Sequence, residues 1–148
     1  MDRNRRDIQV PNVTDSLEQV RGFVFAFLED TPFEEAERRR LVLAVDETVA
    51  SNILCSEALE RGGETELSLE VDGECFRARV RDTSREPDRV PEEEFENVLE
   101  RARKHEIGIF LVQQIMDEIR YTYCKGIRNE LELVRYLPGR KSGDGEGA

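Results

Sequence analysis

Two runs of alternating residues around a single Asp-Gly pair constrain the fold of this chain more than any other feature. Apolar and polar residues alternate over 64–71 and again over 76–81, and Asp72-Gly73 lies between the two runs. Such alternation is typical of strands with one buried face, and Asp-Gly is favoured in two-residue hairpin turns. The sequence therefore predicts a β-hairpin from Glu64 to Arg81.

The turn also predicts which residues of the hairpin face each other. A two-residue loop pairs Val71 with Glu74, so acidic and basic side chains meet on the exposed face and apolar ones on the buried face. The expected pairs are Glu66 with Arg79, Glu64 with Arg81, Leu67 with Ala78 and Leu69 with Phe76.

A short strand and two helices are predicted before the hairpin. Ile8-Gln9-Val10 has the composition of a strand, and apolar residues recur at helical spacing from about Ser16 to Glu29. Thr31-Pro32-Phe33-Glu34 has the pattern of a capping box with proline at the first helical position. We therefore expect a second helix from this segment to about Ser56.

The region after the hairpin is expected to contain helices followed by two strands. Residues 84–106 are polar and include a short amphipathic stretch, and a further helix is predicted over about Gly108–Glu118. Strands are predicted over Ile119–Cys124 and Glu130–Leu137, on either side of a turn at Lys125-Gly126.

The resulting order, β-α-α-β-β-α-β-β, predicts an α+β fold. We expect a two-layer α/β sandwich in which a mixed, mostly antiparallel sheet is covered by helices on one face. Residues 1–7 are predicted to be a loose N-terminus, 8–137 a single domain and 138–148 a disordered tail.

The charge balance excludes several classes of partner. The chain of 148 residues has 22 Lys+Arg and 33 Asp+Glu, a formal net charge of −11, which nucleic acids and anionic membranes would repel. No segment approaches the roughly 18–20 consecutive apolar residues that span a bilayer, and MDRNRRDI has no apolar signal-peptide core. We therefore expect a cytoplasmic protein with neither nucleic acid nor membrane as partner.

Three local patterns make the sequence recognisable. They are Leu43-Ala44-Val45-Asp46-Glu47, Val80-Arg81-Asp82, and the run from Gly108-Ile109-Phe110-Leu111-Val112 to Met116-Asp117-Glu118. With these patterns the chain resembles the GHKL (Bergerat) type of histidine-kinase-like ATPase domain. Within that fold it resembles the anti-sigma-factor serine kinases of bacterial partner-switching systems, the SpoIIAB/RsbW type.

The resemblance implies ligands, partners and roles for particular residues. ATP and Mg²⁺ would be the ligands, and a sigma factor and a STAS-domain anti-anti-sigma protein the partners, with a homodimer left open. Glu47 matches the general base for a partner's serine, and Asp82 matches the aspartate that accepts a hydrogen bond from the adenine amino group. Gly108 matches the final glycine between the nucleotide lid and the following helix.

The position implied for the Mg²⁺ ligand departs from the family pattern. The family's asparagine lies four residues after the base, where this chain has Ser51. Asn52 lies about 140° round the helix from Glu47, so it could hold the metal only if the helix bulged locally.

Three further departures fall on the implied nucleotide pocket. Ser84 and Glu106 replace glycines, and Glu132 stands where the family has a threonine near the adenine aspartate. We therefore expect Glu106 to repel phosphates and Glu132 to place a second carboxylate beside Asp82. Tight ATP binding through the family's contacts is not expected.

Two functions stay open at this stage. The departures favour an anti-sigma-factor-like regulatory protein with a degraded ATP site, which binds a sigma factor, a STAS-type antagonist or both. The alternative is an active ATP- and Mg²⁺-dependent protein serine kinase, which retained Glu47 and Asp82 favour. Each retained residue also has a purely structural interpretation, Glu47 as a solvated helix residue and Asp82 as the cap of a turn.

Overall fold

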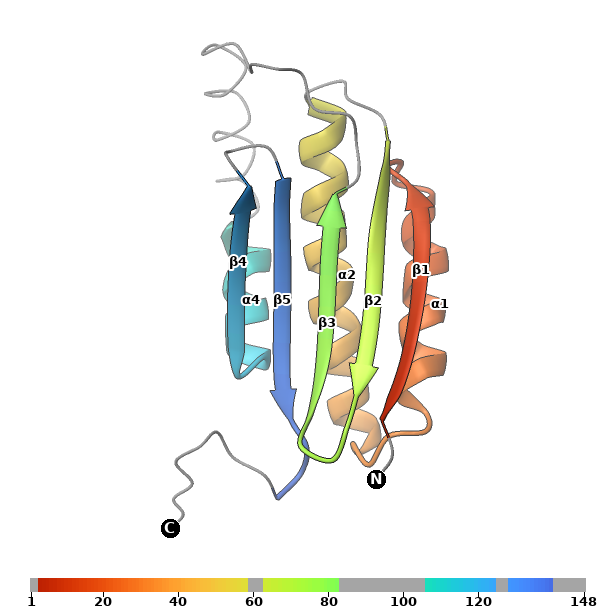
Figure 1. Cartoon of the computed structure of the whole chain (residues 1–148), viewed down its shortest axis with the longest axis vertical. Coiled ribbons are helices and arrows are strands. Elements are labelled where there is room, and N and C mark those ends of the chain that lie inside the picture. Colours follow the sequence, from red (N-terminus) through yellow and green to blue (C-terminus); the bar gives the residue numbers. More distant parts are fainter. Residues whose placement is uncertain (1–2, 59–62, 83–105, 125–127, 140–148) are drawn as a thin grey trace.

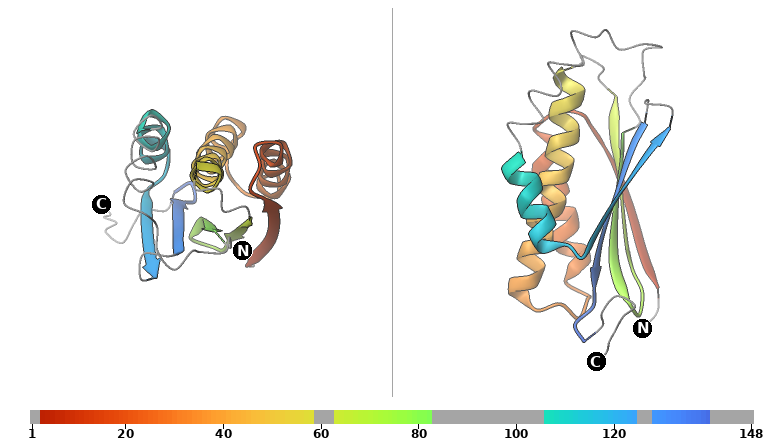
Figure 2. Two further views of the ribbon diagram at one scale, coloured as in Figure 1. Left: turned by 90° about the horizontal axis from the view of Figure 1, so that it is seen from above. Right: turned by 90° about the vertical axis from the view of Figure 1, so that its left-hand side faces the viewer.

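The protein is a two-layer α+β sandwich, as the sequence predicts (Figures 1 and 2). The computed structural model describes residues 3–58, 63–82, 106–124 and 128–139. Its five-stranded sheet has the order β1-β2-β3-β5-β4, and every described pairing is antiparallel rather than mixed. The described helices cover one face of this sheet. The elements are β1 (Asn4–Pro11), α1 (Ser16–Leu28), α2 (Glu35–Ala58), β2 (Glu64–Val71), β3 (Cys75–Asp82), α4 (Glu106–Ile115), β4 (Glu118–Cys124) and β5 (Arg128–Tyr136).

The core lies between the helices and the sheet. Alternate residues of β2 and β3 enter it, and α2 contributes the apolar face that lies over the middle of the sheet. Phe76 is fully buried, and its ring centroid lies 6.1 Å from that of Phe27 and 6.4 Å from that of Phe33. The other large, fully buried side chains are Leu28, Leu41, Ile53, Leu67, Leu69, Leu133, Val10, Val20, Val24, Val45 and Val49.

The hairpin is confirmed, but its predicted register is wrong by two residues. Val71 pairs with Phe76, and the loop consists of Gly73 and Glu74 between Asp72 and Cys75. The Asp72 carboxylate decides this, because its Oδ1 accepts hydrogen bonds from the backbone N–H groups of Glu74 (2.7 Å) and Cys75 (2.9 Å). An even shift leaves each side chain on its predicted face, so the buried set is unchanged.

The predicted start of the second helix is also wrong. The helix begins at Glu35, and the Glu34 carbonyl accepts the bond from the Arg38 N–H (2.9 Å). Thr31 does not cap it; its hydroxyl donates to the Leu28 carbonyl (2.6 Å) at the end of α1. The intervening segment buries Phe33 in the core, which offsets the missing capping box.

The other boundaries differ modestly from those predicted. β1 begins at Asn4 rather than Ile8, so residues 4–7 belong to the sheet and are not a loose terminus. The Ser68 hydroxyl donates to Asp7 (2.6 Å) and helps to hold this early part of the strand. α4 begins at Glu106 and ends at Ile115, earlier at both ends than predicted.

Some sequence predictions fall outside the described residues. They are the amphipathic helix within 84–105, the turn at Lys125-Gly126 and residues 140–148 of the predicted tail. Among the helices that are described, none combines the length and apolar character needed to cross a membrane.

Candidate functional site

One end of the sheet brings buried polar side chains from three segments together. Asn12 directly follows the last residue of β1, Thr65 is the second residue of β2, and Asp82 is the last residue of β3. Thr65 and Asp82 face each other across the β2–β3 pair, and the Asn12 N–H donates to the Gly63 carbonyl (3.0 Å). The exposed fractions of Asn12, Thr65 and Asp82 are 4%, 0% and 6%. Polar groups this deeply buried need hydrogen-bond partners.

These side chains form a hydrogen-bonded chain that a fourth one, from α2, completes. The Asn52 amide donates to the Thr65 hydroxyl (2.6 Å), which donates to the Asn12 amide oxygen (2.5 Å). The Asn12 amide nitrogen in turn lies 3.4 Å from Asp82 Oδ1. We call this set, Asn52–Thr65–Asn12–Asp82, the relay. It links α2 to the position that the family resemblance assigns to adenine.

The relay directs Asn52 toward the sheet. α2 is α-helical from Glu35 to Ala58, so no bulge moves Asn52 round to the face that Glu47 and Ser51 share. Both Glu47 and Ser51 are half-buried. Asn52 therefore does not fit the Mg²⁺ position, and within the described residues no group of three or more His, Cys, Asp or Glu side chains could hold a metal ion.

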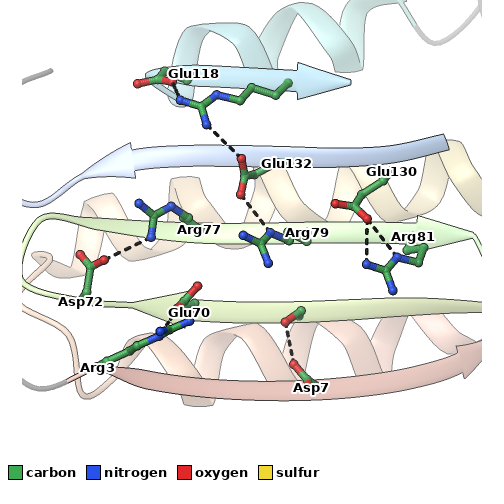
Figure 3. Close-up of polar contacts among 12 residues, drawn as sticks. Arg3, Asp7, Glu70, Asp72, Arg77, Arg79, Arg81, Glu118, Glu130 and Glu132 are labelled. Carbon is green, nitrogen blue, oxygen red and sulfur yellow. Dashed lines mark hydrogen bonds and ion pairs between the residues drawn. The ribbon is translucent and has the colours of Figure 1, made fainter. Parts of the chain in front are cut away.

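The expectation that Glu132 lies beside Asp82 is wrong. β5 pairs Glu132 with Arg79, whose side chain lies on the face of the sheet opposite to the helices. There the Glu132 carboxylate contacts Arg79 (3.0 Å), as Figure 3 shows, and also Arg120 (3.4 Å). Asp82, one residue further along β3 than Arg81, points to the helix side with Val80 and Ala78. The two carboxylates therefore belong to different faces.

The helix-free face of the sheet carries a charge network that the sequence only partly indicated. Arg81 contacts Glu66 (3.2 Å) and Glu130 (2.8 Å), and the bond to Glu130 raises the pKa of its guanidinium. We call the set that these contacts build the open-face ladder. Its members are Glu66, Arg81, Glu130, Arg79, Glu132, Arg120 and Glu118. Figure 3 shows the pairs that Arg81 forms with Glu130 and Arg79 with Glu132. The sequence signal was the pair of alternate glutamates in β5, Glu130 and Glu132, opposite alternate arginines in β3.

Asp46, next to Glu47, is a mostly buried carboxylate that sequence reasoning did not single out. Its side chain is 15% exposed, its Oδ2 lies 3.8 Å from Arg21, and its buried Oδ1 has no hydrogen-bond partner in the described part of the chain. Burial raises the pKa of Asp46, and the neighbouring charge of Glu47 raises it further while Arg21 lowers it. Glu47, at the predicted base position, thus has beside it a carboxylate, Asp46, whose burial is only partly offset by the charge of Arg21.

The side chains of three other predicted site residues are not described by the structure. Ser84 lies outside the described residues, and Glu106 and Gly108 are placed only as backbone, in the first turn of α4. The structure therefore leaves the predicted phosphate repulsion by Glu106 as a prediction.

A cavity of about 700 Å³ lies where β5 ends. β3, whose last residue is Asp82, ends at the opposite end of the sheet from β5 (Figure 1). The cavity is formed where α2 begins and β5 ends, and Arg135 crosses it between Glu37 (2.6 Å) and Asp117 (3.3 Å). Three charged groups of this cavity, Glu37, Asp117 and Arg135, are thus paired with each other, and none of them belongs to the relay.

The sequence of residues 10–135 matches a family described as the histidine kinase-like ATPase domain. The chain belongs to that family. The match runs from the end of β1 to the last residues of β5, so it includes Glu47 and the whole relay. A search of curated proteins found no match. Membership supports ATP as a ligand of this histidine kinase-like ATPase domain and agrees with the predicted GHKL-type fold.

Proposed function

We propose that this histidine kinase-like ATPase domain is a regulatory protein of the anti-sigma-factor type. It binds an adenine nucleotide through Asp82, holds a sigma factor, a STAS-domain antagonist or both, and transfers phosphate poorly because its metal position is degraded. The observation that supports this best is the relay, which keeps Asp82 in place while it turns Asn52 away from Glu47.

The adenine half of the proposal is supported by the chemistry at Asp82. A carboxylate offers about four acceptor sites, and Asn12 donates to one of those on Oδ1. An exocyclic amino group is a donor that suits such an acceptor, and a mostly buried acceptor discriminates strongly against analogues that lack the donor. Glu132 does not lie on the face of the sheet that carries Asp82. One of the four departures from the family pattern that predicted weak ATP binding is thereby removed.

The proposed weak binding of Mg²⁺ is supported by the residues that follow Glu47 on α2. Ser51 takes the family's metal position, and Asn52 is directed to Thr65. Phosphoryl transfer depends on cations that neutralise the developing charge between the phosphates. A nucleotide here would therefore bind with little help from Mg²⁺, and transfer would be slow.

Calorimetric titration with ATP and ADP, with and without Mg²⁺, tests this proposal. We expect wild-type affinity for ATP to change less than about threefold when Mg²⁺ is added, equivalent to under 1 kcal/mol. Ser51→Asn should make binding Mg²⁺-dependent, and Ser51→Ala is the matched control. Mg²⁺-dependent micromolar binding by the wild-type protein, lost in Asn52→Ala, would refute the proposed weak binding of Mg²⁺.

An active serine kinase is the second candidate, and the placement of Glu47 favours it. Glu47 is half-buried on the same face of α2 as Ser51, where a base for a partner's hydroxyl would stand. Glu47→Gln separates the two functions when a STAS-domain partner is incubated with Mg-ATP. An active kinase loses rapid phosphorylation of the partner serine in Glu47→Gln. The regulatory protein proposed above keeps its partner affinity and shows little phosphorylation of the partner in either form.

A further inference from the structure

The relay joins residues far apart in the sequence into one directed chain. Its members come from α2, the start of β2, the segment after β1 and the end of β3. Thr65 and Asn12 are 53 residues apart, and Asn12 and Asp82 are 70 apart. No local turn or cap requires such contacts, so a structural role confined to one element does not explain them.

Donor and acceptor chemistry fixes the direction of the hydrogen bonds in the relay. Thr65 has one hydroxyl proton, and because it accepts from Asn52 it is free to donate that proton to the Asn12 oxygen. The Asn12 NH₂ group is then the part that faces Asp82. The reversed amide would place its oxygen against a carboxylate oxygen, two acceptors without a proton between them. Each member thus determines the orientation of the next.

Burial makes the side chains of the relay rigid. Thr65 is fully buried, Asn12 and Asp82 almost fully, and an unmade bond among such groups costs the full desolvation of the group left unpaired. The backbones of Thr65 and Asp82 are fixed by the β2–β3 pairing. With the backbone fixed, the Asp82 side chain can still rotate about χ1 and χ2, and the contact with the Asn12 amide is one restraint on that rotation.

We propose that Asn52, Thr65 and Asn12 are positioning residues that aim the Asp82 carboxylate at the 6-amino group of a purine nucleotide. This inference rests on the proposed nucleotide binding and deepens it, because it assigns the selectivity for adenine to side chains that do not touch the base. A carboxylate held at one angle accepts the amino hydrogen well, and one that rotates does not.

The test compares ATP with purine riboside triphosphate, which lacks the 6-amino group, by calorimetric titration of the full chain. Thr65→Val removes the hydroxyl at nearly constant volume, and Thr65→Ser restores it. Thr48→Val is the matched control, because Thr48 is also buried but its hydroxyl donates to Ala44 within its own helix (2.9 Å). Thermal unfolding of each variant separates loss of fold from loss of selectivity.

We expect the wild-type protein, Thr65→Ser and Thr48→Val to prefer ATP by about tenfold or more, the range for a hydrogen bond to a charged group. Thr65→Val should lower this preference to below about threefold. If Thr65→Val does not fold, Asn52→Ala, which removes the outermost donor of the relay, takes its place and should lower the preference in the same direction.

The outcomes separate this inference from the function on which it rests. A preference unchanged in both Thr65→Val and Asn52→Ala overturns the relay as a positioning device and leaves nucleotide binding intact. An equal loss in Thr48→Val also overturns it, because the effect would then follow from core packing. If the wild-type protein binds neither nucleotide, both proposals are overturned together.

Discussion

Replacement of Asp72 tests the register that the structure gives to the β2–β3 hairpin. Asp72 Oδ1 accepts hydrogen bonds from two backbone N–H groups, those of Glu74 (2.7 Å) and Cys75 (2.9 Å), and Oδ2 accepts one from Arg77 (3.1 Å). Asp72→Ala removes all three bonds. In the register predicted from sequence, Asp72 would lie within the loop instead, and its loss would matter little.

The expected destabilisation is about 2 kcal/mol at neutral pH. Fully buried hydrogen bonds to a charged group contribute about 1.5–3 kcal/mol each, but the Asp72 side chain is 29% exposed and Arg77 is 31% exposed. The two backbone bonds resemble those of a helix cap, whose loss costs roughly 0.5–2 kcal/mol. Asp72→Asn retains an acceptor oxygen without the charge, so it should cost about half as much.

The pH dependence provides an independent check. The backbone bond from Cys75 lowers the pKa of Asp72 below its ordinary value of 3.8, with further lowering by Glu74 and Arg77. A lowered pKa gives stability that is fully present above pH 4 and is lost as pH falls through the folded-state pKa. The difference between wild type and Asp72→Ala should therefore shrink below pH 4.

Urea unfolding at several pH values measures both effects, with Asp30→Ala as a control at an exposed aspartate between α1 and α2. A cost below about 0.5 kcal/mol for Asp72→Ala, comparable with an ordinary surface change, would refute the observed turn. So would a cost that stays constant down to pH 3, because the carboxylate would then contribute no charge-dependent bond.

Two other substitutions test the carboxylates of Asp46 and Glu132. Asp46→Asn should stabilise the protein by about 1 kcal/mol at pH 7, because burial raises the pKa of Asp46 and the charged form is the costly one; the gain should shrink as pH falls through that raised pKa, and a loss of thermal stability at pH 7 would show that the contact with Arg21 dominates. Glu132→Thr should leave ATP affinity within about twofold, because Glu132 and Asp82 lie on opposite faces of the sheet. It should cost about 1 kcal/mol in thermal unfolding, because the Glu132 side chain is only 14% exposed and contacts both Arg79 and Arg120, whose own side chains are more exposed. A clear gain in ATP affinity would place Glu132 in the nucleotide pocket.

The alternation of residues predicted the faces of the strands but not their pairing. A slip of two residues leaves every side chain on its face, so hydrophobic pattern alone does not distinguish the two hairpin registers. The choice depends on Asp72, whose carboxylate bonds the backbone N–H groups ahead of it. In the same way, the capping-box pattern at Thr31 was overruled by burial of Phe33.

The candidate site was predictable only where a residue belonged to a local pattern. Glu47 and Asp82 were found in such patterns, and helical geometry alone indicated that Asn52 and Glu47 would point in different directions. Asn12 and Thr65 gave no signal, because their partners lie on other strands and become neighbours only through the sheet order. Glu132 was assigned to the wrong face, although its pairing with Arg79 is a charge pattern that strand periodicity could have predicted.

The open-face ladder also affects the long-range electrostatic attraction between the protein and charged molecules. With three arginines and four glutamates, it carries only one of the protein's eleven net negative charges, so the ladder itself contributes little to the long-range field. A basic partner would be attracted to other parts of the surface, at a rate that falls as ionic strength rises. Covering the ladder would also require dehydration of charges that already have partners, which makes this face a poor docking surface despite its size.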